Sequence, residues 1–183
     1  MYVLRKSAFD PSFVEVCNEE GVVEEIPFSL QLKKSPRFET LEMAKEWLKE
    51  EERKRARGKA IASLARRDLA SNLLKTKLKE KGFSSVAIES AIVGLPLDDD
   101  NFWQRTIERE WKRGIGPHRI VAKWVPKGMP KQLVFQQITL EMQAERIQEA
   151  FTQKKESAKI ARLLISKGFD ASLVEKFFRL AHS

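Results

Sequence analysis

The sequence predicts a mainly α-helical protein, in which three tandem three-helix repeats of helix-turn-helix character form an elongated, curved array behind a small antiparallel β-sheet. The main observation is one pattern that occurs three times: two apolar residues four apart, then Lys-Gly and a Phe or Met. Its copies end at Lys81-Gly82-Phe83, Lys127-Gly128-Met129 and Lys167-Gly168-Phe169, with spacings of 46 and 40 residues. Such periods are typical of arrays of helical units that cannot bury their apolar faces alone. Function is therefore expected on an extended surface.

Residues 1–36 are predicted to form the β-sheet, with two or three strands. Segments 2–6, 12–17 and 22–28 are rich in Val, Phe, Ile and Tyr, as strands usually are. Asn18-Glu19-Glu20-Gly21 is typical of a hairpin loop, because Gly21 can adopt a positive φ. Pro27 has no backbone N–H, so the third segment is expected at a sheet edge or at a strand end.

The three repeats are expected at residues 37–97, 98–139 and 140–183, with about nine helices in all. A helix is predicted from about Thr40 to Arg67, and Gly58 is a candidate break that would divide it in two. In each repeat a helix is expected to begin at Ser71, Pro117 or Ser157 and to end at the Lys-Gly pair, where glycine can take the left-handed conformation. The next helix then begins at Ser84, Pro130 or Asp170.

Charge is distributed unevenly along the chain. The net charge is +8, but residues 1–50 carry 7 Lys/Arg against 10 Asp/Glu, and the rest carries 27 against 16. This asymmetry favours a polyanion or an acidic protein surface as partner. Cys17 is the only cysteine, which excludes an intrachain disulfide. No apolar stretch approaches the roughly 20 residues that cross a bilayer, so we expect a cytoplasmic protein with no membrane partner.

Catalysis is not expected, because no constellation of catalytic residues is present. His118 and His182 are the only histidines, and neither has partners at metal-ligand spacing. No Gly-rich phosphate-binding loop occurs. The carboxylates Asp98-Asp99-Asp100 fit a helix N-terminus better than a cation site. We therefore predict no enzyme activity, no cofactor and no bound metal.

The strongest candidate for a functional surface is a row of cations on the predicted helix 99–113. Arg105, Arg109, Lys112 and Arg113 fall on one stripe of this helix, while Trp103, Ile107 and Trp111 fall on another that should face the core. Arg119, Lys123 and Lys127 follow on the next helix and at its end. Such a surface could bind a phosphate backbone or acidic protein groups. The alternative is an ordinary solvated helix face, partly neutralised by Glu108 and Glu110.

Three motifs together resemble the RecX family of regulatory proteins. They are Leu97-Asp98-Asp99-x2-Phe102, Arg113-Gly114-Ile115-Gly116-Pro117-x-Arg119-Ile120 and Lys127-Gly128-Met129. The first and third copies of the repeated pattern lie where that family has its corresponding helices, so the resemblance covers about residues 60–180. Trp103 and Pro126 depart from the family pattern, which bears on local packing rather than on architecture.

The resemblance implies an inhibitor or modulator of the RecA recombinase that binds in the groove of the RecA–DNA filament. It further implies a role in recombination, DNA repair and the SOS response, and action as a monomer. Whether single- or double-stranded DNA is contacted directly is left open. The alternative is a stand-alone helical nucleic-acid-binding protein of helix-turn-helix character.

Overall fold

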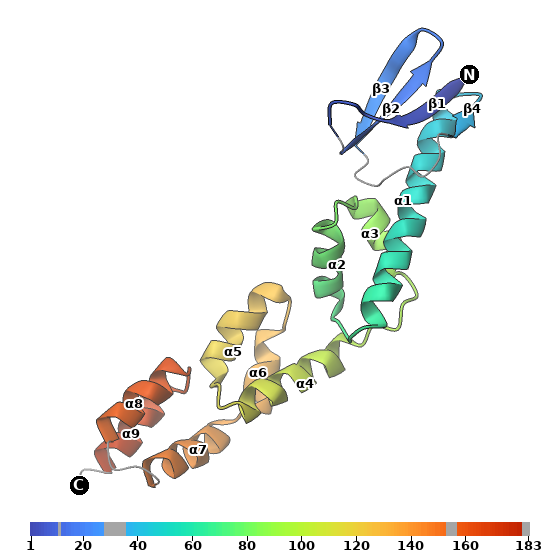
Figure 1. Ribbon diagram of the computed structural model, residues 1–183. Helices are drawn as coiled ribbons and strands as arrows, with labels where there is room; N and C mark the ends of the chain where they lie inside the picture. The colour runs from blue at the N-terminus through green and yellow to red at the C-terminus, as the bar shows by residue number, and fades with distance from the viewer. Residues whose placement is uncertain (11, 28–35, 153–156, 181–183) are drawn as a thin grey trace. The chain divides into compact units, whose positions relative to one another are not determined.

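The computed structural model describes residues 1–10, 12–27, 36–152 and 157–180 (Figure 1). The protein is mainly helical, with a small antiparallel sheet at its N-terminus, as predicted. The chain divides into two compact units, Met1–Leu97 and Asp98–Ser183. Each unit is described by itself below.

The sheet of the first unit has four strands rather than the two or three expected. They are β1 (Tyr2–Lys6), β2 (Phe13–Asn18), β3 (Gly21–Pro27) and β4 (Arg37–Phe38). The order is β3-β2-β1-β4, with every neighbouring pair antiparallel. β4 was missed because two residues are too few to show a strand pattern. Gly21 has φ 131° in the β2–β3 hairpin, and Pro27 lies on an edge strand, as predicted.

The helix α1 (Leu41–Leu64) supports both the sheet and the next two helices. Its first half packs on the sheet, where Leu4, Val14 and Val16 form a core with Ala44 and Leu48. The predicted break at Gly58 is wrong, because the helix is continuous there. A mid-helix glycine costs only about 1 kcal/mol relative to alanine, and packing along the second half of α1 offsets this cost.

That second half of α1 packs against α2 (Ser71–Lys79) and α3 (Ser85–Ile92). Two charged side chains of α1 hold α3 at its ends. The Glu52 carboxylate accepts hydrogen bonds from the Ser84 amide at 2.7 Å and from the Ser84 hydroxyl at 2.8 Å. The Arg57 guanidinium donates to the carbonyl oxygens of Ala91 at 3.3 Å and Val93 at 2.8 Å. Both charges have the sign that the helix dipole favours.

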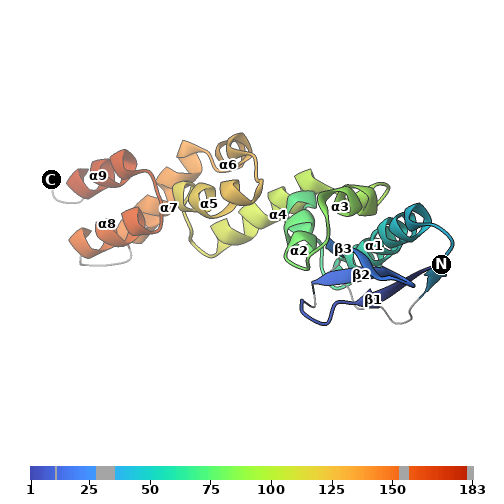
Figure 2. The same cartoon turned by 90° about the horizontal axis from the view of Figure 1, so that it is seen from above.

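The described residues of the chain contain nine α-helices and one 3-10 helix, η1 (Val125–Lys127). Six of the α-helices belong to the second unit. They are α4 (Asp99–Lys112), α5 (Pro117–Trp124), α6 (Lys131–Gln137), α7 (Leu140–Thr152), α8 (Ser157–Ser166) and α9 (Ala171–Leu180). The side chain of Asp98 caps α4 by accepting from the Asn101 amide. α8 and α9 lie side by side in both views (Figures 1 and 2). Within the described parts of the chain, no helix is long and apolar enough to cross a membrane.

The three Lys-Gly turns share one local geometry. Gly82, Gly128 and Gly168 have φ of 83°, 98° and 85°. In each turn the amide after the glycine donates to the carbonyl five residues back, at 3.3, 3.2 and 3.1 Å. Ser71, Pro117 and Ser157 begin α2, α5 and α8, as predicted. The superposition of the three helix pairs, the repeat boundaries and the curved array remain predictions.

Candidate protein and nucleic-acid interface

The four cations predicted on one stripe of α4 are all exposed. Arg105, Arg109, Lys112 and Arg113 form this set, which we call the α4 row. On other sides of the helix, Trp103 is 2% exposed and Ile107 is fully buried. The amphipathic pattern of α4 therefore places the α4 row at the surface of the second unit.

The α4 row includes one ion pair within the helix. The ammonium of Lys112 lies 2.6 Å from a carboxylate oxygen of Glu108, and both side chains are largely exposed. The hydrogen bond and charge of Lys112 lower the pKa of Glu108. Exposed pairs of this kind contribute little to stability, because water screens them. Lys112 can therefore exchange Glu108 for a partner's anion at small cost.

Lys123 on α5 has a structural partner that the sequence did not reveal. Glu110 is only 3% exposed, and its carboxylate accepts from the Lys123 ammonium at 2.7 Å and from the Trp124 indole at 3.2 Å. Burial acts to raise the pKa of Glu110, but these two donors and the charge of Arg113 outweigh it and lower the pKa. In the alternative of an ordinary solvated helix face, Glu110 would have partly neutralised the surface. It is instead a buried carboxylate whose counter-ion is Lys123.

Arg119 and Lys127, the other two predicted contacts, are also exposed but touch the protein itself. The guanidinium of Arg119 donates to the Ser166 carbonyl at 2.9 Å, at the end of α8. The ammonium of Lys127 lies 4.8 Å from the ring centre of Trp124, and that of Lys123 lies 5.0 Å from the same ring. Trp124 is half-buried and packs edge-on against Trp103 at 6.1 Å. These contacts orient the α5 cations.

The start of α5 is fixed to the turn between α8 and α9 by two glycines. The Gly116 amide donates to the Lys167 carbonyl at 2.8 Å, and the His118 amide donates to the Gly168 carbonyl at 3.0 Å. These bonds satisfy amides that a helix N-terminus leaves without intrahelical partners. A Cβ on Gly116 would lie 2.3 Å from the Gly168 carbonyl carbon. The Gly-Ile-Gly-Pro motif thus allows the backbone at Gly116 to lie directly against the backbone at Gly168, and this contact also brings Arg119 to the end of α8.

One cation of this surface was missed altogether. Arg146 of α7 donates to the backbone carbonyls of Trp111 and Lys112, at the end of α4. Its guanidinium also lies 4.6 Å from the ring centre of Trp111. No local signal could have revealed this position, because Arg146 is 35 residues from Trp111 and on another helix. Arg146 therefore adds a cation beside the C-terminal end of the α4 row.

Taken together, these cations form a surface that can recognise negatively charged groups. All seven predicted residues are exposed, and several also have partners within the chain: a carbonyl for Arg119, carboxylates for Lys112 and Lys123, and an aromatic ring for Lys127. Among the described residues, no three His, Cys, Asp or Glu side chains are arranged to hold a metal ion. Guanidinium and ammonium groups in this setting can pair with phosphates or with carboxylates.

Two of three comparisons with known proteins find regulatory proteins named RecX. No family model matches the chain. The chain is 27% identical over 153 residues to the regulatory protein RecX of Caldanaerobacter subterraneus subsp. tengcongensis, covering 77% of this chain and 78% of that protein. A crystal structure of a regulatory protein RecX matches with a TM-score of 0.61 at 16% identity, covering 96% of this chain and 98% of the other. At that identity the structural match shows the fold alone. The predicted resemblance to the RecX family is confirmed.

Proposed function

We propose that this RecX-like chain inhibits the RecA recombinase by binding in the groove of the RecA–DNA filament. Through this binding it would modulate recombination, DNA repair and the SOS response. RecX-like sequence and fold support a regulator, and the observation that carries the binding surface is the exposed α4 row. In this proposal the protein acts in the cytoplasm, as a monomer, and by binding rather than by catalysis.

The chemistry of the α4 row suits a filament groove. DNA phosphates and protein carboxylates are both present in a nucleoprotein filament, and guanidinium groups pair with either in a bidentate manner. Successive cations four residues apart on a helix are about 6 Å apart along its axis. A chain bound along the groove through such a row would bridge neighbouring subunits. It would thereby hinder strand exchange, ATP turnover or filament extension.

The proposed contacts are not equivalent. Arg105, Arg109 and Arg113 are exposed members of the α4 row, and Lys127 lies in the short 3-10 helix that follows α5. Arg119 and Lys123 are held by Ser166 and Glu110, so replacing them would disturb the fold as well as the surface. The test of binding therefore uses exposed cations of the α4 row.

The test is an inhibition assay with two matched variants. Arg105→Gln with Arg109→Gln removes two charges from the α4 row and keeps good helix formers. Arg66→Gln with Arg67→Gln removes two exposed charges from the end of α1. Two surface charge contacts of about 0.5–1 kcal/mol each correspond to a roughly 5–30-fold loss of affinity. We expect that loss in the half-inhibiting concentration of strand exchange for the first variant only. Equal inhibition by the two variants would remove the α4 row from the proposal.

The same proteins separate this proposal from a stand-alone nucleic-acid-binding protein. Binding is measured to RecA filaments assembled on single-stranded DNA, to naked single-stranded DNA and to duplexes of varied sequence. Preferential binding to filaments supports the regulator. Sequence-specific binding to a duplex without recombinase supports the alternative, whose structural basis would be the helix pairs around the glycine turns.

A further inference from the structure

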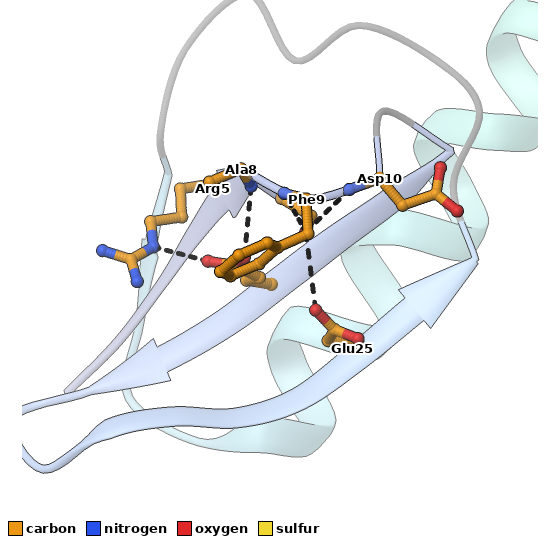
Figure 3. Close-up of polar contacts among 7 residues, drawn as sticks. Arg5, Ala8, Phe9, Asp10 and Glu25 are labelled. Atoms are coloured by element: carbon orange, nitrogen blue, oxygen red, sulfur yellow. Dashed lines mark hydrogen bonds and ion pairs between the residues drawn. The ribbon is translucent and has the colours of Figure 1, made fainter.

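Phe9 is the most exposed large apolar side chain in the described part of the protein. It is 94% exposed, compared with 70% for Val93 and 67% for Val86. It lies in the loop between β1 and β2 (Figure 3). Single apolar residues are common on protein surfaces, so exposure alone does not make a site. The loop that carries Phe9 provides the further observation.

The backbone on both sides of Phe9 is held by buried polar side chains. The Ala8 amide donates to a Glu15 carboxylate oxygen at 3.3 Å. The amides of Phe9 and Asp10 donate to the Ser7 hydroxyl oxygen at 3.3 and 3.5 Å. Three successive backbone amides are thus bound, and Figure 3 shows the network around the loop. The loop presents Phe9 from a fixed backbone.

The polar network that holds the loop includes a charged side chain that is almost completely buried. Ser7 and Glu15 are 6% and 4% exposed. Glu15 accepts from the Arg5 guanidinium at 2.8 Å, and the Ser7 hydroxyl donates to Glu25 at 3.4 Å. The Arg5 hydrogen bond lowers the pKa of Glu15, although burial opposes it. The Arg5 side chain is 58% exposed and that of Glu15 is 5% exposed, so solvent screens this pair, and its role is to specify one loop conformation rather than to add stability. Here that conformation keeps an aromatic side chain in water.

We propose that Phe9 is an apolar anchor for a protein pocket edged by Lys or Arg, and that this pocket lies on the RecA component of the filament. The inference rests on the proposed function. Protein is favoured over nucleic acid by charge: Asp10 and Glu25 are exposed near the loop, and residues 1–27 carry six Asp/Glu against the two cations Arg5 and Lys6. These carboxylates repel phosphates, including those of anionic lipids. Because the backbone of Phe9 is already held, binding has to restrict only the side chain, and an aromatic side chain has few rotatable bonds to lose.

The experiment compares Phe9→Ser with Val86→Ser, an exposed apolar control on α3. Affinity is measured for RecA filaments on single-stranded DNA with a non-hydrolysable ATP analogue, and for the same DNA without RecA. Burial of a phenylalanine side chain corresponds to a roughly 10–150-fold gain in affinity. We expect Phe9→Ser to lose affinity for filaments in that range, with unchanged binding to naked DNA. Val86→Ser should match the wild type in both assays.

A second variant tests the charged edge of the pocket. Asp10→Asn removes the charge but keeps the side-chain oxygen that accepts from the Ser12 amide. It should weaken filament binding about two- to fivefold, in the range of an exposed ion pair. An affinity of Phe9→Ser for filaments equal to that of the wild type would overturn this inference and leave the proposed function standing. A parallel loss on naked DNA would assign Phe9 to base stacking and also overturn it. If the wild-type protein does not bind filaments, the proposed function is wrong and this inference fails with it.

Discussion

Replacing Lys123 by Met tests the most consequential contact of the second unit. The substitution keeps the length and apolar stem of the side chain and removes only the ammonium. Glu110 would then keep the Trp124 indole N–H at 3.2 Å but lose its charged partner at 2.7 Å. The side chain of Glu110 is 4% exposed, so water cannot replace that partner without rearrangement.

The expected loss follows from this geometry. Removing one partner of a fully buried ion pair costs about 3–5 kcal/mol. Lys123 is 46% exposed, so solvent screens the pair, and we expect the free energy of unfolding to fall by roughly 2 kcal/mol. Lys112→Met is the matched control, because it breaks the exposed pair with Glu108. That change should cost no more than about 0.5 kcal/mol.

The stability difference between the wild type and Lys123→Met should depend on pH, and the direction follows from the pKa of Glu110. In the wild type the pKa of Glu110 is lowered, so its ionised form stabilises the fold above the unfolded pKa, and this contribution is lost as the pH falls through the folded pKa. Without Lys123, burial is less opposed and the pKa of Glu110 rises. As the pH falls through this raised pKa, the carboxyl of Glu110 becomes neutral in the variant, so the charge penalty disappears. The difference between the two proteins should therefore shrink from pH 7 to pH 4.

Urea denaturation at both pH values measures these differences. Adding Glu110→Gln to Lys123→Met removes the unpaired charge and should recover part of the lost stability at pH 7. The reasoning fails if Lys123→Met costs no more than Lys112→Met, or if its cost is the same at pH 7 and pH 4.

Three further substitutions test the packing. Gly116→Ala should lower the free energy of unfolding by more than about 2 kcal/mol, because the new Cβ would meet the Gly168 backbone at 2.3–2.4 Å. Gly58→Ala should raise it by up to about 1 kcal/mol, because the helix is regular there and a Cβ would meet no atom within 4 Å. Leu78→Ala, at a fully buried position, should cost roughly 2–5 kcal/mol. Each is measured by chemical denaturation, and a sign opposite to that stated would contradict the corresponding assignment.

Local signals predicted the helices of this protein well. Ser71, Pro117 and Ser157 each begin a helix, because caps and first-turn prolines act within a few residues. The exposed face of α4 was also predictable, since it follows from helix periodicity. The continuity of α1 through Gly58 was not, because packing outweighs a weak local preference.

Contacts between separate elements explain what the sequence did not reveal about the candidate site. Glu110 and Lys123 are 13 residues apart and on different helices. From the sequence pattern alone, both residues would be taken for solvated charges, whereas the fold pairs Lys123 with a buried Glu110. Trp124 has the same place in the repeated pattern as Leu78 and Leu164, which are both buried. It is only half-buried, with its indole N–H bound to Glu110.

The contributions of the α4 row and of Phe9 to filament affinity should depend differently on salt concentration. A salt titration therefore tests whether one acts through charge and the other through apolar contact. The α4 row acts through charge, and the screening length falls from about 10 Å at 0.1 M to about 3 Å at 1 M salt. Apolar contact by Phe9 does not weaken in this way. In a salt titration of filament binding, Arg105→Gln with Arg109→Gln should therefore show a shallower dependence than the wild type, and converge with it at high salt. Phe9→Ser should keep the wild-type slope and remain weaker at every salt concentration. Parallel curves for all three proteins would show that the α4 row does not bind through charge. Convergence of the Phe9→Ser curve with the wild-type curve at high salt would show that Phe9 does not bind through apolar contact.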